Sequence, residues 1–185
     1  MPNTQLLILL SFFPAIVGLA MQFLHAQTPA ERLLALALLL FCPELSRMAW
    51  IDLEMLSAVS EQQEDSRLVQ LHKIVFSTIV LELLGFYVAL SSLVWGARVV
   101  LFSQLWFNLL AKIQLYPQKT TSIVAFGIAE RLPVLIANTV GVTLLAFWSM
   151  AEIRVWLASG VMFLVVIFLL IKYVVLPTVS ADADA

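Results

Sequence analysis

The sequence has too few charged residues for a protein whose whole surface faces water. Of its 185 residues, only 12% are Asp, Glu, Lys or Arg, whereas 62% are hydrophobic. A soluble domain carries roughly 25% charged residues, so about half of the usual surface charge is missing. Because a lipid-facing surface needs no such charge, the composition predicts an integral membrane protein whose main surroundings are the lipid bilayer.

Several kinds of functional site are also missing. Cys42 is the only cysteine, so an intrachain disulfide is excluded and the redox compartment is not indicated. The net charge is −2 and there is no run of Lys or Arg, which argues against nucleic acid as a partner. The sequence also lacks a Gly-rich phosphate loop, an HExxH sequence, a cysteine pair and a nucleophile elbow. We therefore expect no enzyme, no catalytic residue and no metal site.

Apolar stretches predict an all-α fold, a membrane bundle of four to five transmembrane helices in one domain over residues 1–177. A bilayer crossing of roughly 30 Å needs about 20 apolar residues. The first stretch lacks the basic residues that begin a signal peptide, so we interpret it as a retained helix. The short link Ala151–Arg154 makes the last two spans an antiparallel hairpin. The predicted spans are 4–24, 74–95, 132–150 and 155–176, and residues 178–185 are expected to form a short, flexible acidic tail.

Residues 31–51 leave the number of spans open. Their purely apolar part, Leu33–Cys42, covers only about 15 Å at 1.5 Å per residue, and Pro43 then removes a backbone donor. We favour a kinked span that buries Glu44 and Arg47 as a pair one turn apart. The alternative is a re-entrant half-helix that returns to the same face of the membrane.

Two other segments are predicted to lie at the membrane surface. Residues 98–116 carry a narrow polar stripe, which favours an interfacial amphipathic helix, although a further span is the alternative. Residues 43–65 hold half of the acidic residues and form either a solvated connector or an acidic docking arm. The two segments together predict a docking surface that consists of Gln104, Asn108, Lys112, Trp106, Glu61, Glu64 and Asp65.

Glu82 is the most informative polar residue, because it lies near the middle of an otherwise apolar span. An ionised carboxylate at that depth needs a partner, and an unpaired one is expected to take up a proton. Glu82 is therefore a candidate proton or cation site, or a ligand to the metal of a pigment. The structural alternative is a neutral or paired side chain that joins helices. The candidate partners for that role are Arg47, Asn138 and Thr139.

The two histidines, His25 and His72, allow a haem or chlorophyll alternative to a protein without cofactors. Each lies at the end of an apolar span. If residues 31–51 cross the membrane, His25 and His72 lie on opposite faces and cannot share an iron. If that segment is re-entrant, the two histidines share a face.

Small residues and a repeated tetrapeptide add weaker signals. Gly85 and Ala89, Ser92 and Gly96, and Ala137 and Gly141 are each four residues apart, which permits close approach of helices. The tetrapeptide Ala-Glu-Arg-Leu occurs at 30–33 and at 129–132, each time at the start of a predicted span, and with five spans both copies lie on one face. We interpret it as a useful helix start rather than an internal repeat. With five spans, Lys and Arg divide six against four, which favours an external N-terminus and an internal C-terminus.

Two stretches, FSQLWFNLLAKIQLYP at 102–117 and ERLPVLIA at 130–137, resemble uncharacterised small multi-pass membrane proteins of the cyanobacterial type. The resemblance implies a bacterial inner membrane or a thylakoid membrane, with photosynthetic complexes as neighbours. Our leading hypothesis is a non-enzymatic accessory or assembly subunit that docks onto a larger membrane complex. One alternative is a small proton- or ion-linked transporter that uses Glu82, which at this chain length would have to oligomerise. The other alternative is a pigment- or haem-binding membrane protein.

Overall fold

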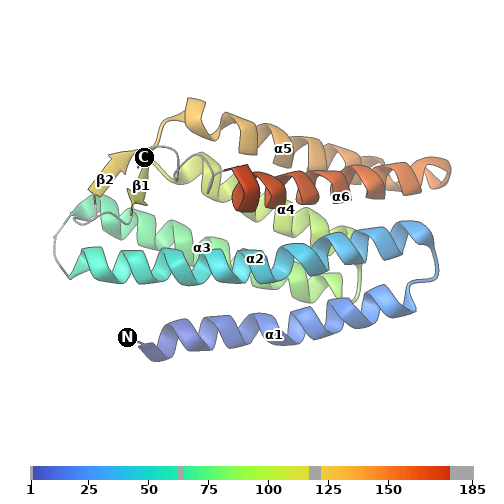
Figure 1. Ribbon diagram of the computed structural model, residues 1–185, viewed down its shortest axis with the longest axis horizontal. Helices are drawn as coiled ribbons and strands as arrows, with labels where there is room; N and C mark the ends of the chain where they lie inside the picture. The colour runs from blue at the N-terminus through green and yellow to red at the C-terminus, as the bar shows by residue number, and fades with distance from the viewer. Residues whose placement is uncertain (1, 62–64, 117–121, 176–185) are drawn as a thin grey trace.

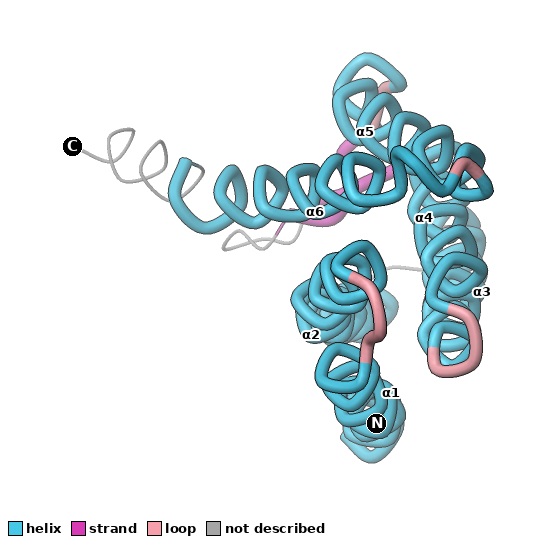
Figure 2. Tube along the Cα trace, turned by 90° about the vertical axis from the view of Figure 1, so that its right-hand side faces the viewer, coloured by secondary structure: helices cyan, strands magenta, loops and turns pink. Residues whose placement is uncertain are grey.

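The computed structural model describes residues 2–61, 65–116 and 122–175 and contains six long helices in that part of the chain. The helices form three successive antiparallel hairpins, α1 with α2, α3 with α4, and α5 with α6 (Figure 1). α2 contacts α1, α3, α4 and α6, so it holds the hairpins together. In Figure 2, α1 and α2 form one group, α3 and α4 lie beside them, and α5 and α6 lie above, with α6 running across the view. The helices are α1 (Pro2–His25), α2 (Pro29–Ser60), α3 (Ser66–Ala89), α4 (Leu93–Leu110), α5 (Ile128–Ala146) and α6 (Arg154–Leu170).

All six helices are long and apolar enough to cross a membrane. Their outward faces carry large apolar side chains, among which Trp156 is 78% exposed and Phe163 is 63% exposed. A soluble monomer rarely exposes so much contiguous apolar surface. The predicted class of helical membrane bundle is therefore supported, and the described residues hold six helices of spanning length where four to five spans were predicted.

The additional helix is α4, at Leu93–Leu110, where we expected an interfacial helix over 98–116. The prediction assumed that the polar stripe faces the membrane surface. In the structure, Gln104 and Asn108 are buried inside the bundle and form hydrogen bonds there. A polar stripe that faces other helices does not oppose a crossing of the membrane. The end of the predicted segment also departs from an all-α fold, because residues 113–116 form a strand.

A small antiparallel hairpin closes one end of the bundle. It pairs β1 (Ile113–Tyr116) with β2 (Ser122–Ala125), and Ile113 lies opposite Ala125. We call this the hairpin end. It also holds the start of α1, the end of α2, the start of α3, the end of α4 and the start of α5 (Figure 1).

The predicted span 74–95 crosses a chain reversal that the sequence does not mark. α3 ends at Ala89 and α4 begins at Leu93, and the link between them contains neither Gly nor Pro. Buried backbone groups need partners where water is scarce. The N–H of Ser92 donates to Val88, and Gln22 Nε2 of α1 donates to the Leu90 carbonyl oxygen at 2.6 Å. Tertiary contacts thus stabilise a turn that local composition would not.

Helix α2 is continuous from Pro29 to Ser60, so residues 31–51 are not a re-entrant half-helix. At 1.5 Å per residue, its 32 residues extend about 48 Å, well beyond roughly 30 Å of hydrocarbon. The predicted acidic segment 43–65 begins within this helix, and its residues up to Ser60 form the second half of α2.

Both copies of Ala-Glu-Arg-Leu lie at helix starts, but at opposite ends of the bundle. In α2, the Thr28 hydroxyl accepts from the N–H of Glu31, and the Glu31 carboxylate accepts from the N–H of Thr28, each at 3.2 Å. In α5, the Glu130 carboxylate accepts from the N–H of Gly127 at 3.3 Å. The prediction of a useful helix start is confirmed, because each glutamate satisfies a free backbone donor. The placement on one face is wrong, since it assumed five spans.

The backbones of helices α3 and α4 approach each other closely at two glycines. A Cβ added to Gly96 would lie closer than 3.0 Å to main-chain atoms of Ala89, and one added to Gly85 would lie 2.9 Å from the Val100 nitrogen. Only glycine fits at such contacts between backbones. The small-residue prediction is confirmed for this helix pair.

Candidate functional site

Glu82 is the centre of a buried polar network between α3 and α4. Its side chain is only 5% exposed, and Gln104 Nε2 donates to Glu82 Oε1 at 2.7 Å. The two residues meet because they lie at similar distances from the turn that joins α3 to α4. The partners expected from the sequence are not used: Arg47 binds Glu44, while Asn138 and Thr139 each donate to a carbonyl oxygen of their own helix.

The network continues from Glu82 towards the hairpin end. Asn108 lies one turn after Gln104 and donates from Nδ2 to the Gln104 carbonyl oxygen at 2.8 Å. Arg131 of α5 then donates from Nη1 to the Asn108 carbonyl oxygen at 2.6 Å. Its other donors reach the carbonyl oxygens of Gly127 and Phe126. Arg131 thus satisfies carbonyl groups at the end of α4 and in the loop before α5, and it is only 4% exposed.

A small cavity separates Glu82 from a second carboxylate, that of Asp52 on α2. The cavity holds about 20 Å³, which exceeds the roughly 10–15 Å³ that one water molecule needs. Within the described residues, Asp52 has no hydrogen-bond partner. Two carboxylates therefore border a space the size of one water molecule. The lining residues are Met48, Ala49, Asp52, Val75, Thr78, Ile79, Glu82, Gln104 and Phe107.

A second cavity of about 230 Å³ lies next to the first, on the side of the hairpin end. Asp52 and Gln104 line both cavities, so they stand between Glu82 and this larger space. The larger cavity reaches the hairpin at Ile113 and the far helix pair at Phe168. Two adjoining cavities thus lie between the hairpin end and Glu82.

Glu44 belongs to a separate ion cluster that joins α2 to the end of α6. Its carboxylate accepts from Arg47 Nε and Nη2 at 3.1 and 3.0 Å, and also from Lys172 Nζ and the Tyr173 hydroxyl. The predicted pair of Glu44 and Arg47 is confirmed. Two cations and one hydroxyl occupy Glu44, so it has no capacity left for a ligand, and we assign it to helix packing.

The two histidines lie at opposite ends of the bundle, because α2 runs unbroken between their helices. His25 ends α1, and its Nδ1 lies 2.8 Å from the Met21 carbonyl oxygen. His72 is exposed near the start of α3. Within the described residues, no group of three or more His, Cys, Asp and Glu side chains could hold a metal ion. The two histidines cannot share a haem.

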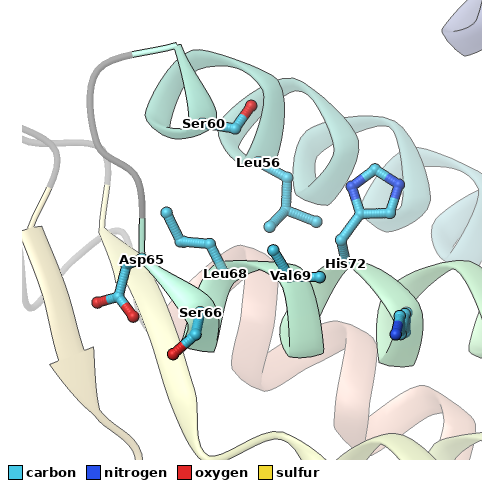
Figure 3. Close-up of a pocket in the computed structure, with 8 residues that line it drawn as sticks. Leu56, Ser60, Asp65, Ser66, Leu68, Val69 and His72 are labelled. Atoms are coloured by element: carbon cyan, nitrogen blue, oxygen red, sulfur yellow. The ribbon is translucent and has the colours of Figure 1, made fainter.

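A larger hollow of about 650 Å³ is a surface groove between the end of α2 and the start of α3. Figure 3 shows Leu56, Leu68 and Val69 directed into it, with His72 at its edge, whereas the Asp65 carboxylate points away. Asp65 accepts from the guanidinium and the N–H of Arg67, and these contacts hold the pKa of Asp65 below its usual value. His72 and Lys73 also line the groove, but its one carboxylate, Asp65, is engaged by Arg67.

The predicted docking surface is not one surface. Gln104 and Asn108 are buried, while Trp106 is half-exposed and donates to Ser77 Oγ at 3.0 Å. Lys112 and Glu61 are exposed at the hairpin end. Glu64 and the tail 178–185 lie outside the described residues. The inward orientation of Gln104 and Asn108 removes the polar stripe on which the prediction depended.

Comparison with known proteins adds no name to this site. No protein-family model, no curated protein and no solved structure matches the chain. Function is therefore argued from the network itself, in which the sequence identified Glu82 but missed Asp52. If α2 had been predicted to continue beyond residue 51, the spacing of four residues would have placed Asp52 on the same helix face as Met48, which also lines the cavity.

Proposed function

We propose that this protein is a small membrane carrier that couples a proton on Glu82 to the movement of a cation. The observation that carries the proposal is the placement of Glu82 and Asp52 on the walls of one cavity of about 20 Å³. A carboxylic acid deep in a membrane protein is a common element of proton pathways. Gln104 holds Glu82 in one orientation through Oε1, which leaves Oε2 to bind or release a proton.

Asp52 supplies the second part of the proposed pathway. It lies where the small cavity meets the larger one, so it could pass a proton or a cation between Glu82 and the hairpin end. Neutralisation of Glu82 by a proton and its pairing with a cation are alternatives for the same carboxylate. Competition of this kind is the simplest way to couple two ions at one site.

Access to the site differs between the two ends of the bundle. Beyond Glu82, on the side away from the hairpin end, Phe86 and Ala89 are fully buried, and Gly85 and Gly96 bring α3 against α4. Among the described residues, the small cavity that Glu82 lines shares Asp52 and Gln104 with the larger cavity, which extends towards the hairpin end. A site that is open to one side at a time is what alternating access requires.

Six spans also change the expected orientation. They place more of the described Lys and Arg at the hairpin end than at the other end, and by the positive-inside rule the hairpin end then faces the cytoplasm or its equivalent. We propose a bacterial inner membrane or a thylakoid membrane as the location. The basic residues of the described chain at the hairpin end are Arg67, Lys73, Lys112 and Arg131, against Arg32, Arg98 and Arg154 at the other end, while Arg47 and Lys172 lie beside Glu44 near the middle of α2.

The test is proton movement in vesicles that contain the purified protein and an internal pH dye. After an acid load inside, addition of Na⁺, K⁺ or an alkylammonium salt outside is expected to raise the internal pH. The Glu82→Gln variant should abolish this response, because glutamine keeps the shape and the hydrogen bond to Gln104 but cannot ionise. The matched control is Glu152→Gln, whose carboxylate is exposed between α5 and α6. An unchanged response in Glu82→Gln would refute the proposal.

The accessory-subunit hypothesis would gain support if the protein were recovered in a larger complex in mild detergent. Two residues of the predicted docking surface, Gln104 and Asn108, are buried inside the bundle. No contact among the described residues therefore favours the accessory-subunit hypothesis. The pigment hypothesis predicts an absorbance band of the purified chain. A colourless protein would end that hypothesis without affecting the carrier.

A further inference from the structure

We propose that the 230 Å³ cavity binds a small organic cation, an ammonium group on an apolar body, with Asp52 as its counter-ion. The inference names the class of cation that the proposed carrier would move. It rests on the proposed function, because only that function gives the binding a purpose. The cavity lies between α2, α3, α4, β1, α5 and α6, so its occupant would touch five of the six long helices.

The charge of the cavity lining points to a cation. Asp52 is the only ionisable side chain on its walls, and within the described residues it has no hydrogen-bond partner. Lys172, whose charge acts on Asp52 from a distance, pairs directly with Glu44 instead, and Arg131 donates to three backbone carbonyl groups. A partly buried carboxylate without a hydrogen-bond partner is costly, and an ammonium ligand would supply that partner.

Two amide side chains add further acceptors. Gln104 and Asn108 already use their NH₂ groups, towards Glu82 and the Gln104 backbone respectively. Their side-chain oxygens accept no hydrogen bond within the described residues. Every fully shielded side-chain nitrogen or oxygen in that part of the chain has a hydrogen-bond partner, so these oxygens are in contact with open space. An ammonium group can donate three hydrogen bonds, and Asp52, Gln104 and Asn108 offer matching acceptors.

The rest of the lining suits an apolar body. Met48, Met55, Phe107 and Phe168 are among its side chains. Methionine adapts to irregular ligands, and aromatic rings attract cations as well as apolar groups. A volume of about 230 Å³ lies below the roughly 300–1,000 Å³ of pockets for drug-sized ligands. The cavity therefore fits a molecule of a few carbon atoms, such as an alkylammonium or benzylammonium ion, rather than a large lipophilic cation.

Titration calorimetry of the full chain in detergent tests the inference with n-butylammonium and, as neutral and anionic counterparts of the same body, n-butanol and butyrate. We expect binding of the ammonium ion alone. The Asp52→Asn variant should weaken that binding about 10- to 100-fold, which corresponds to a lost hydrogen bond to a charged group. The matched control is Glu54→Gln, an exposed acid two residues away on α2 that lines neither cavity.

Each other outcome overturns the inference. Equal affinity for n-butanol, unchanged affinity in Asp52→Asn, or an equal loss in Glu54→Gln would show that Asp52 is not the counter-ion. Asp52→Glu keeps the charge and should keep the preference for ammonium. If Asp52→Asn does not give a single species in size-exclusion chromatography, the inference is tested on the unaltered chain alone. Binding of n-butylammonium without binding of n-butanol would then support it, and equal binding of both would refute it. Proton movement that depends on Glu82 with Na⁺ or K⁺, without ammonium binding, would refute this inference and leave the proposed function intact.

Discussion

The Gly96→Ala variant is expected to lose most of its folded population in detergent. The added Cβ would lie closer than 3.0 Å to the main chain of Ala89, and a backbone cannot move aside as a flexible side chain can. Overpacking typically costs about 1–3 kcal/mol, and contact with main-chain atoms places this change at the upper end or beyond. The measurement is the midpoint of unfolding in an SDS titration, followed by tryptophan fluorescence.

Gly127→Ala is the matched control for this prediction. Gly127 precedes α5, has no atom within 4 Å of an added Cβ, and has a φ of −69°, which any residue can adopt. Its unfolding midpoint should therefore stay close to that of the unaltered chain. A Gly96→Ala variant as stable as Gly127→Ala would mean that α3 and α4 are not packed as closely as described.

The Glu44→Leu variant is expected to destabilise the bundle by about 3 kcal/mol. Loss of one partner of a buried ion pair typically costs about 3–5 kcal/mol. The lower end applies here because the Arg47 side chain is 44% exposed and that of Lys172 is 23% exposed, while that of Glu44 is only 4% exposed. Without Glu44, both cations and the Tyr173 hydroxyl lose their shared acceptor, and α6 loses its polar attachment to α2.

A double-mutant cycle separates this ion cluster from simple loss of packing. Lys172→Met should also destabilise, but Glu44→Leu combined with Lys172→Met should cost less than the sum of the two single changes, because neither charge is then left alone. The shortfall is the coupling between the two residues. Glu152→Leu, at an exposed acid, should have little effect. Strict additivity in the same SDS titration would argue against the contact between Glu44 and Lys172.

These two predictions concern the stability of the bundle and leave the proposed site unaltered. Gly96 and Glu44 line neither the small cavity nor the larger one. Glu82→Gln and Asp52→Asn act in the opposite way, since they change the site and keep the volume of the side chain. Measurement of all four variants therefore separates loss of fold from loss of function.

The sequence by itself determined the features that depend on composition or on short spacings. Its hydrophobic content predicted a helical membrane bundle, and the i,i+3 spacing predicted the pair of Glu44 and Arg47, which the structure confirms. Glu130 and Glu31 mark helix starts through contacts with a residue three positions away. Such features were predictable because both partners lie on the same turn of one helix.

Only the tertiary structure decided where the polar faces point and which distant residues meet. The spacing of Gln104 and Asn108 showed that they share a face of α4, but not that this face meets Glu82 rather than lipid headgroups. The sequence also did not show the turn at residues 90–92, which needs Gln22 from α1. Nor did it show that Asp52 and Glu82 line the same cavity. The physical reason is that in a membrane both the buried and the lipid-facing sides of a helix are apolar. Hydrophobic periodicity, which orients a helix in a soluble protein, therefore does not show which side faces the bundle.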